Sequence, residues 1–102
     1  MQERFLAAQK EAGIIPDAPS VSTWDSTIIA VDALRALGTN ATAEQVHTYV
    51  ENLHDYYGVY GYYDYRDGNQ RGINSLQNLL VVRWDPAKTY WVPVSELGGG
   101  VR

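Results

Sequence analysis

The stretch DYYGVYGYYDYRDGNQRG, residues Asp55–Gly72, decides how this chain folds, because it places six tyrosines within ten positions. Tyrosine joins a large apolar ring to a hydroxyl that needs a hydrogen-bond partner, so such a run must lie against other groups. Consecutive side chains of a strand point to opposite faces of the sheet. The pattern predicts a strand over Val59–Tyr65. Either both of its faces are covered, or aromatic surface is left for a ligand or a second chain.

The sequence after the tyrosines predicts further strands. A turn is expected at Asp67-Gly68, because this pair tolerates the backbone angles that tight turns need. Leu79–Trp84 is a continuous apolar run, which is typical of a strand covered on both faces. The connection Asp85–Lys88 contains a proline suited to a type I turn, and Thr89–Val92 is the returning strand. We therefore expect about three mostly antiparallel strands.

The sequence before the tyrosines predicts helices. The first covers Arg4–Ala12 and stops at a glycine. A capping box at Ser22–Asp25 is expected to open the second helix, whose apolar residues recur at helical spacing until Gly38. A second capping box at Thr42–Gln45 opens a short third helix. The fold class that follows is α+β, with two to three N-terminal helices followed by about three mostly antiparallel strands.

Composition narrows the functional classes. The chain has 102 residues, of which 45% are hydrophobic and 20% charged, so it forms one domain at most. The net charge of −4 is spread without a basic patch, and we therefore expect no nucleic-acid partner, even though tyrosines can stack on bases. No apolar stretch reaches the roughly 18 residues of a membrane span. The absence of cysteine excludes disulfides and thiolate metal sites.

No residue pattern indicates catalysis, a metal or a cofactor. His47 and His54 are seven residues apart, whereas two metal ligands on one helix usually lie three or four apart. Asp64, Asp67 and Asn69 resemble the start of a calcium loop, but the glutamate that closes such a loop is absent, and a turn explains them better. The serines lack a histidine–acid setting. We predict that the protein is not an enzyme and holds no metal or cofactor.

The order of segments resembles the C-terminal portion of a type I periplasmic solute-binding protein. The nearest branch is the leucine/isoleucine/valine-binding family of ABC-transporter receptors. Trp24-Asp25 stands where that family commonly has a tyrosine-aspartate pair in a helix, and an aromatic strand precedes a turn at Asp67-Gly68. The resemblance covers nearly all of residues 3–95 and corresponds to about the last quarter of such a receptor. Its four passages are Phe5–Gly38, Thr42–Gly61, Tyr62–Ile73 and Leu79–Val94.

The resemblance implies a fragment of a two-lobed α/β periplasmic binding fold that takes part in uptake of small, amino-acid-like or aromatic-acid solutes. It implies a periplasmic or extracellular location. The partners it implies are the remainder of the receptor, a membrane permease and a small-molecule solute bound by the full-length protein. In the family, the segment before the tyrosine-aspartate helix borders the cleft, and this segment maps onto Ser20, Val21 and Ser22.

As a single domain or fragment, residues 1–102 have too few helices to cover both faces of the predicted sheet. We therefore predict a homo-oligomer, formed where strands expose apolar surface. The alternative function is a free-standing dimeric protein-interaction module that uses the tyrosine-rich strand. Residues 96–102 are expected to form a loose tail. The predicted interface residues are Tyr60, Tyr62, Tyr63, Tyr65, Leu80 and Val82.

Overall fold

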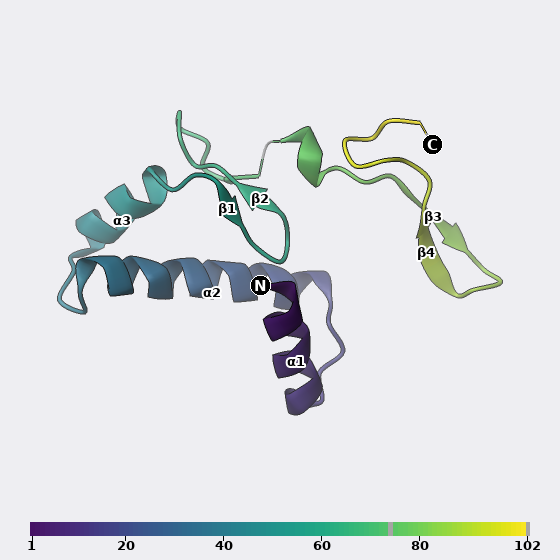
Figure 1. The fold of residues 1–102 in the computed structure, drawn as a ribbon, viewed down its shortest axis with the longest axis horizontal. Coiled ribbons are helices and arrows are strands. Elements are labelled where there is room, and N and C mark those ends of the chain that lie inside the picture. The colour runs from purple at the N-terminus through teal and green to yellow at the C-terminus, as the bar shows by residue number, and fades with distance from the viewer. Residues whose placement is uncertain (74, 102) are drawn as a thin grey trace.

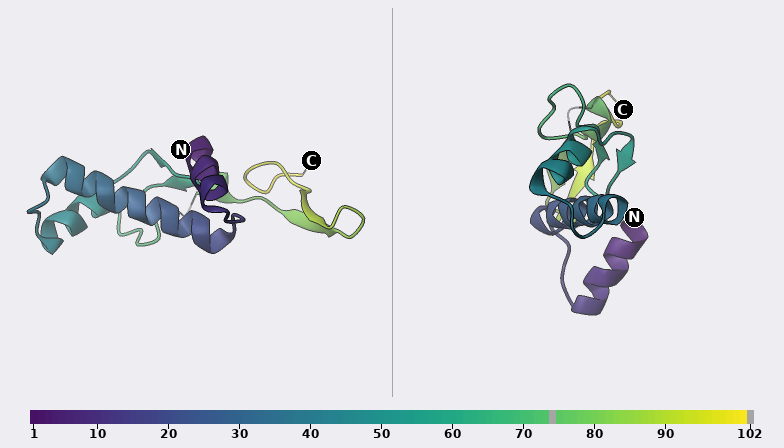
Figure 2. Two further views of the ribbon diagram at one scale, coloured as in Figure 1. Left: turned by 90° about the horizontal axis from the view of Figure 1, so that it is seen from below. Right: turned by 90° about the vertical axis from the view of Figure 1, so that its left-hand side faces the viewer.

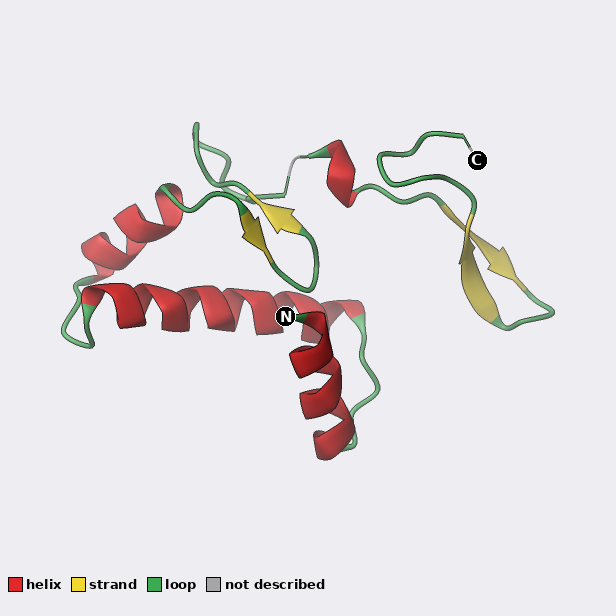
Figure 3. Ribbon diagram, viewed as in Figure 1, coloured by secondary structure: helices red, strands yellow, loops and turns green. Residues whose placement is uncertain are grey.

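The structure, a computed structural model, describes residues 1–73 and 75–101. Three helices are followed by two small antiparallel sheets, which confirms the predicted α+β class (Figures 1 and 3). The elements in chain order are α1 (Gln2–Ala12), α2 (Ala18–Leu37), α3 (Ala43–Glu51), β1 (Tyr56–Tyr57), β2 (Tyr62–Tyr63), the short 3₁₀ helix η1 (Leu76–Asn78), β3 (Val82–Asp85) and β4 (Tyr90–Pro93).

The longest helix, α2, begins earlier than the sequence pattern predicts. Asp17 is its N-cap: the Asp17 carboxylate accepts a hydrogen bond from the Ser20 N–H, and the Ser20 hydroxyl accepts one from the Asp17 N–H, both at 2.9 Å. These bonds also lower the pKa of Asp17. The predicted capping box at Ser22–Asp25 is therefore wrong, because a better box with proline in its first turn lies upstream.

The other two helices follow the sequence patterns closely. The capping box at Thr42 and Gln45 is present and opens α3, as predicted. The first helix ends where Gly13 adopts the left-handed conformation with φ of 68°, which glycine takes without strain. α1 crosses the N-terminal part of α2 (Figure 2). The buried ring of Phe5 meets Trp24 of α2 edge-on, with 5.5 Å between the ring centroids.

The tyrosine run forms a hairpin and not the single strand predicted over Val59–Tyr65. The chain reverses between β1 and β2, and the turn is closed by a 2.9 Å hydrogen bond from the Gly58 N–H to the Gly61 carbonyl. The reversal sets Tyr56 opposite Tyr63 and Tyr57 opposite Tyr62, and the rings of each pair are in contact. Tyrosines that one strand would have placed on two faces therefore pack mainly on each other.

A buried carboxylate fixes this turn against α2. Asp25 has no exposed surface, and its oxygens accept hydrogen bonds from the N–H groups of Val59 and Tyr60, both at 2.7 Å. The Tyr63 hydroxyl donates a third bond, at 2.9 Å. A carboxylate can be buried only where donors replace its lost water. Three donors do so here, and they tie residues 34 to 38 positions away to the helix.

The glycines of the turn, Gly58 and Gly61, allow two side chains to approach its backbone closely. A Cβ on Gly58 would collide with the Asp25 carboxylate and the Tyr63 ring, and a Cβ on Gly61 would collide with Asn78. The Asn78 amide group accepts a bond from the Tyr62 N–H at 2.7 Å and donates one to the Tyr62 carbonyl at 2.9 Å. The expected close approach at Gly61 is therefore made by this side chain from η1.

The second hairpin lies apart from the helices (Figures 1 and 2). β3 and β4 pair antiparallel, and Trp84 faces Trp91 with 5.3 Å between ring centroids. The prediction that Leu79–Trp84 is covered on both faces is wrong: its apolar side chains remain 39–46% exposed, and only its C-terminal part belongs to a strand. The physical reason is that no other element of the described chain packs as a layer on this hairpin.

The packing leaves an extended molecule. Its radius of gyration is 16.3 Å, against roughly 13 Å for a compact domain of this length. The segment 96–101, expected to be loose, makes backbone hydrogen bonds that include one from the Gly98 N–H to the Leu79 carbonyl. Among the residues described, the buried apolar side chains all belong to the part formed by α1, α2 and the tyrosine hairpin: Phe5, Ile29, Ala33 and Tyr63.

Because Asp25 accepts the hydrogen bonds that hold the tyrosine hairpin on α2, its replacement should detach the hairpin from this helix. We expect Asp25→Ala to lower the free energy of unfolding by about 3 kcal/mol, because three buried donors lose their acceptor. Urea denaturation followed by circular dichroism measures this. The matched control is Asp32→Ala on the same helix, which removes an exposed pair with Arg35 and should cost less than about 1 kcal/mol. Equal losses in both variants would contradict the assignment.

Gly58 supplies a second test, which leaves the carboxylate in place. Gly58→Ala should destabilise the protein by about 2 kcal/mol, since the added methyl group displaces Asp25 or the Tyr63 ring. Gly100→Ala is the control, because a Cβ at Gly100 meets no atom within 4 Å. Thermal unfolding of the two variants should separate them by several degrees, and coincident melting curves would contradict the close contact at Gly58.

Candidate functional site

A hollow between α2 and the tyrosine hairpin combines polar and aromatic groups. Its volume is about 420 Å³, which falls in the range of small-molecule sites. α2 contributes one side, and the hairpin with the loop that follows it contributes the other. The lining residues are Ser22, Thr23, Ser26, Tyr60, Tyr63, Tyr65, Arg71 and Ile73.

The α2 side of the hollow presents hydroxyl oxygens. Ser22 and Ser26 are four residues apart and therefore share one face of the helix. The Ser22 hydroxyl donates to the Pro19 carbonyl at 3.1 Å, and the Ser26 hydroxyl donates to the Ser22 carbonyl at 2.9 Å. With their protons engaged by the backbone, both oxygens can accept hydrogen bonds from a ligand.

Arg71 is the charged residue of the lining. Within the part of the chain that the structure describes, its guanidinium forms no ion pair, whereas Arg35 and Arg66 are paired with Asp32 and Asp64. The Asp64–Arg66 pair lowers the pKa of Asp64 to about 2, mainly through the side-chain hydrogen bond. A guanidinium offers parallel donors that match a carboxylate. The charge of Arg71 is therefore available to an anionic ligand.

The remaining wall is aromatic and uncharged at neutral pH. The rings of Tyr63 and Tyr65 stack at 6.0 Å with an angle of 14° between their planes. Burial raises the pKa of Tyr63, and the hydrogen bond to Asp25 raises it further. Burial, and then the charge of Asp25, raise the pKa of Tyr65. The hollow can thus hold an apolar or aromatic group beside an anion, and its lining contains no pairing of a nucleophile with a base.

The three predicted ligand-lining residues lie on α2 and not in a linker, which corrects their setting. Only Ser22 reaches the hollow. Ser20 caps the helix and borders a separate groove between α1 and α2 that also contains Gln9 and Trp24. Val21 is half-buried in the first turn, where its N–H donates to the Asp17 carbonyl. The shift follows from the earlier start of the helix.

The predicted interface residues are divided among four places. Tyr60, Tyr62 and Leu80 meet along a second cleft of about 670 Å³, which the exposed Leu76 and Leu97 also line. Tyr65 lines the hollow, and Val82 lies on the separate β3–β4 hairpin. Tyr63 is only 6% exposed, because its hydroxyl is drawn in to Asp25, and so it cannot contribute an interface surface. Its assignment to the interface is corrected to the core.

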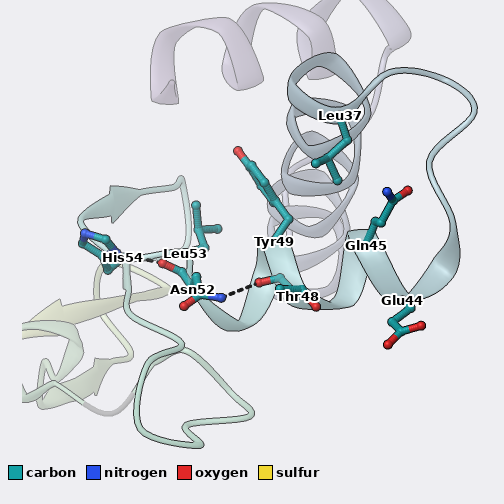
Figure 4. A pocket seen from close by; sticks show the side chains of 8 residues that line it. All are labelled: Leu37, Glu44, Gln45, Thr48, Tyr49, Asn52, Leu53 and His54. Carbon is teal, nitrogen blue, oxygen red and sulfur yellow. Dashed lines mark hydrogen bonds between the residues drawn. The ribbon is translucent and has the colours of Figure 1, made fainter.

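Another concavity, of about 610 Å³, lies between the end of α2 and α3 (Figure 4). Its apolar residues are Leu37, Tyr49 and Leu53. Its polar groups are mostly engaged locally, as Figure 4 shows for the 2.8 Å bond from the Asn52 amide to the Thr48 carbonyl. His54 Nδ1 likewise contacts the Asn52 carbonyl at 2.8 Å. With few free polar groups to orient a small molecule, this groove is a weaker candidate than the hollow.

Sequence reasoning missed Asp25 as an anchor and Arg71 as a ligand group. Asp25 stands beside Trp24 and within the apolar spacing that includes Ile28 and Ile29, and a carboxylate at such a place signals a buried partner. Arg71 had no comparable signal. It follows the Asp67–Gly68 turn, and it lines the same hollow as α2 only because the hairpin folds back onto that helix.

The described residues contain neither a cluster of metal-ligating side chains nor a helix that could cross a membrane. No group of three or more histidine or acidic side chains within residues 1–73 and 75–101 lies close enough to hold a metal ion. None of the helices there combines the length and apolar character needed to cross a bilayer. No protein-family model, curated protein sequence or solved structure matches the chain.

The packed tyrosines should limit stability at alkaline pH. Burial, and then the charge of Asp32, raise the pKa of Tyr56 from 10.0 to about 12. Between these values the unfolded chain loses a proton that the folded chain keeps. The contribution of Tyr56 to the free energy of unfolding is therefore fully present below pH 10 and is lost as the pH rises towards about 12. We expect the free energy of unfolding to fall across this window.

Urea titrations at a series of pH values measure the effect. Tyr56→Phe should flatten part of the fall, and it should cost little at neutral pH because the Tyr56 hydroxyl has no hydrogen-bond partner among the described residues. A free energy of unfolding that stays constant from pH 10 to 12 would contradict the packing of these rings.

Proposed function

We propose that this chain is a non-catalytic part of an extracytoplasmic solute-binding receptor of the type that serves ABC transporters, and that its hollow contributes to a site for a small carboxylic acid. The observation that carries the proposal is the Arg71 guanidinium, which has no ion-pair partner within residues 1–73 and 75–101. It borders a hollow that is lined by tyrosines and by the Ser22 hydroxyl oxygen. An amino-acid-like or aromatic acid offers the matching groups: a carboxylate for Arg71 and an apolar part for the rings.

The exposed apolar surface supports a role as part of a larger body. Leu76 and Leu97, which are 70% and 73% exposed, line the same cleft, and contiguous exposed apolar surface is typical of a site that another polypeptide covers. The remainder of a receptor would provide that cover and would close the open side of the hollow. In this proposal the receptor works in the periplasm or outside the cell and delivers its solute to a membrane permease.

Ligand-induced stabilisation of the natural gene product tests the proposal. We expect a panel of amino acids and aromatic acids to contain a compound that raises the melting temperature by several degrees. Saturation at a hundred times Kd stabilises a protein by about 2.7 kcal/mol. Arg71→Ala should abolish the shift, because the carboxylate loses its cation.

The control is Arg4→Ala, which removes an exposed arginine from α1, outside the lining of the hollow, and should leave the shift intact. A panel without any stabilising carboxylic acid would contradict the proposal, as would a shift of equal size in Arg71→Ala.

A dimeric interaction module is the second candidate. The observation that favours it is the exposure of the β3–β4 hairpin, where Trp84 is 43% and Trp91 56% exposed. Two-stranded hairpins are marginally stable alone and gain stability when further strands or layers are added. If the protein is such a module, no carboxylic acid stabilises it, and the β3–β4 hairpin gains stability only when two copies of the chain associate.

A further inference from the structure

The outer edge of β3 is open. Within residues 1–73 and 75–101, β3 pairs only with β4. The Val94 N–H donates to the Val81 carbonyl, and hydrogen-bonded pairs alternate along an antiparallel ladder. The pairs at Arg83 and Asp85 are therefore the bonded ones within the hairpin, and the backbone groups of Val82 and Trp84 point outward. They offer N–H and carbonyl groups to another strand.

The outer edge of β4 is less suited to pairing. By the same alternation, Trp91 and Pro93 present their backbones outward there. Proline has no N–H, so β4 cannot donate at Pro93, and such residues commonly protect edge strands from association. Any strand that joins this hairpin should therefore add beside β3.

Charge and register identify the strand that fits. Arg83 and Asp85 lie on one face of β3, on either side of Trp84. When two copies of β3 align antiparallel about Trp84, each Arg83 lies directly opposite Asp85 of the partner subunit. These positions form non-hydrogen-bonded pairs, whose Cα atoms are only about 4.5 Å apart. Centring the pair on Arg83 would also match the backbone groups, but it would set the two arginines against each other.

Arg83 and Asp85 both have charged atoms that are free to form this contact within the described part of the chain. Arg83 forms no ion pair within the described part of the chain, while Asp85 uses Oδ1 to accept bonds from the turn. Its Oδ2 lies 3.9 Å from the Lys88 ammonium, too far for a strong bond. The opposite face of the joined sheet would carry Trp84 and Trp91 of both copies, an apolar surface twice the size of that on one hairpin.

We propose that β3 pairs with β3 of a second copy of this chain, antiparallel and centred on Trp84, to form a four-stranded sheet closed by reciprocal Arg83–Asp85 contacts. This interface rests on the β3 edge and not on the carboxylate site. The apolar face of the sheet stays open to cover by other polypeptide, so the pairing is compatible with a receptor and with an interaction module.

Disulfide formation reports the register directly, since the chain contains no cysteine. Opposed residues of a hydrogen-bonded pair lie about 5.5 Å apart at Cα, within reach of a disulfide. Mild oxidation should therefore link Trp84→Cys into a covalent dimer. Arg83→Cys, the matched control, should remain uncrosslinked because the two copies of position 83 are offset along the strands. Efficient linking of Arg83→Cys, or none in Trp84→Cys, would overturn the register.

Charge reversal tests the pairing in solution by sedimentation equilibrium. Arg83→Asp and Asp85→Arg should each weaken self-association at least tenfold, since each sets like charges opposite one another twice. An equimolar mixture should recover a dimer, because both contacts are then attractive in the mixed pair. Recovery also shows that each variant is folded. Arg4→Glu, a reversal on α1, should leave the dimer unchanged.

A wild-type protein that stays monomeric at high micromolar concentration, or a mixture that fails to associate, would overturn the proposal. Neither outcome bears on the thermal shift by carboxylic acids. Loss of that shift with an intact dimer would refute the receptor function alone.

Discussion

The hydrogen bonds accepted by the Asp25 carboxylate hold the rest of the fold in place. They join the middle of α2 to the turn between β1 and β2, two segments that lie far apart in the sequence. A buried carboxylate without donors would be strongly unfavourable, so the helix and the turn stabilise each other or neither is stable. Gly58 belongs to the same constraint, since any side chain there would occupy the space of the carboxylate.

The position of the turn determines which surfaces form. With the turn fixed on α2, Tyr63 faces inward, and Tyr60 and Tyr65 border the hollow beside Ser22. Asn78 then attaches η1 to β2 through its amide group. Beyond this attachment few contacts restrain the chain, and β3–β4 projects away from the helices without a covering layer. The hollow and the open β3 edge are thus consequences of one anchored turn followed by an unsupported hairpin.

Local features of the sequence were predicted where short-range physics decides them. The C-terminal end of α1 and the capping box of α3 follow from residues within a turn of each boundary. The antiparallel return from β3 to β4 follows from a proline-containing turn between apolar runs. The start of α2 was misplaced because two sets of polar residues could cap it, and the upstream pair at Asp17 and Ser20 makes both reciprocal bonds.

The sequence by itself determined the α+β order, the helical first half and one of the two hairpins, because these depend on periodicity, caps and turn residues. Only the tertiary structure decided that the tyrosines fold back as a hairpin, that Asp25 anchors them, and that Arg71 and Ser22 line the same hollow. Alternation along a strand cannot reveal a reversal whose turn is stabilised by a carboxylate 34 residues upstream. Whether the tyrosines form one strand or a hairpin depends on burial and donor geometry across distant segments, and no local sequence pattern contains this information.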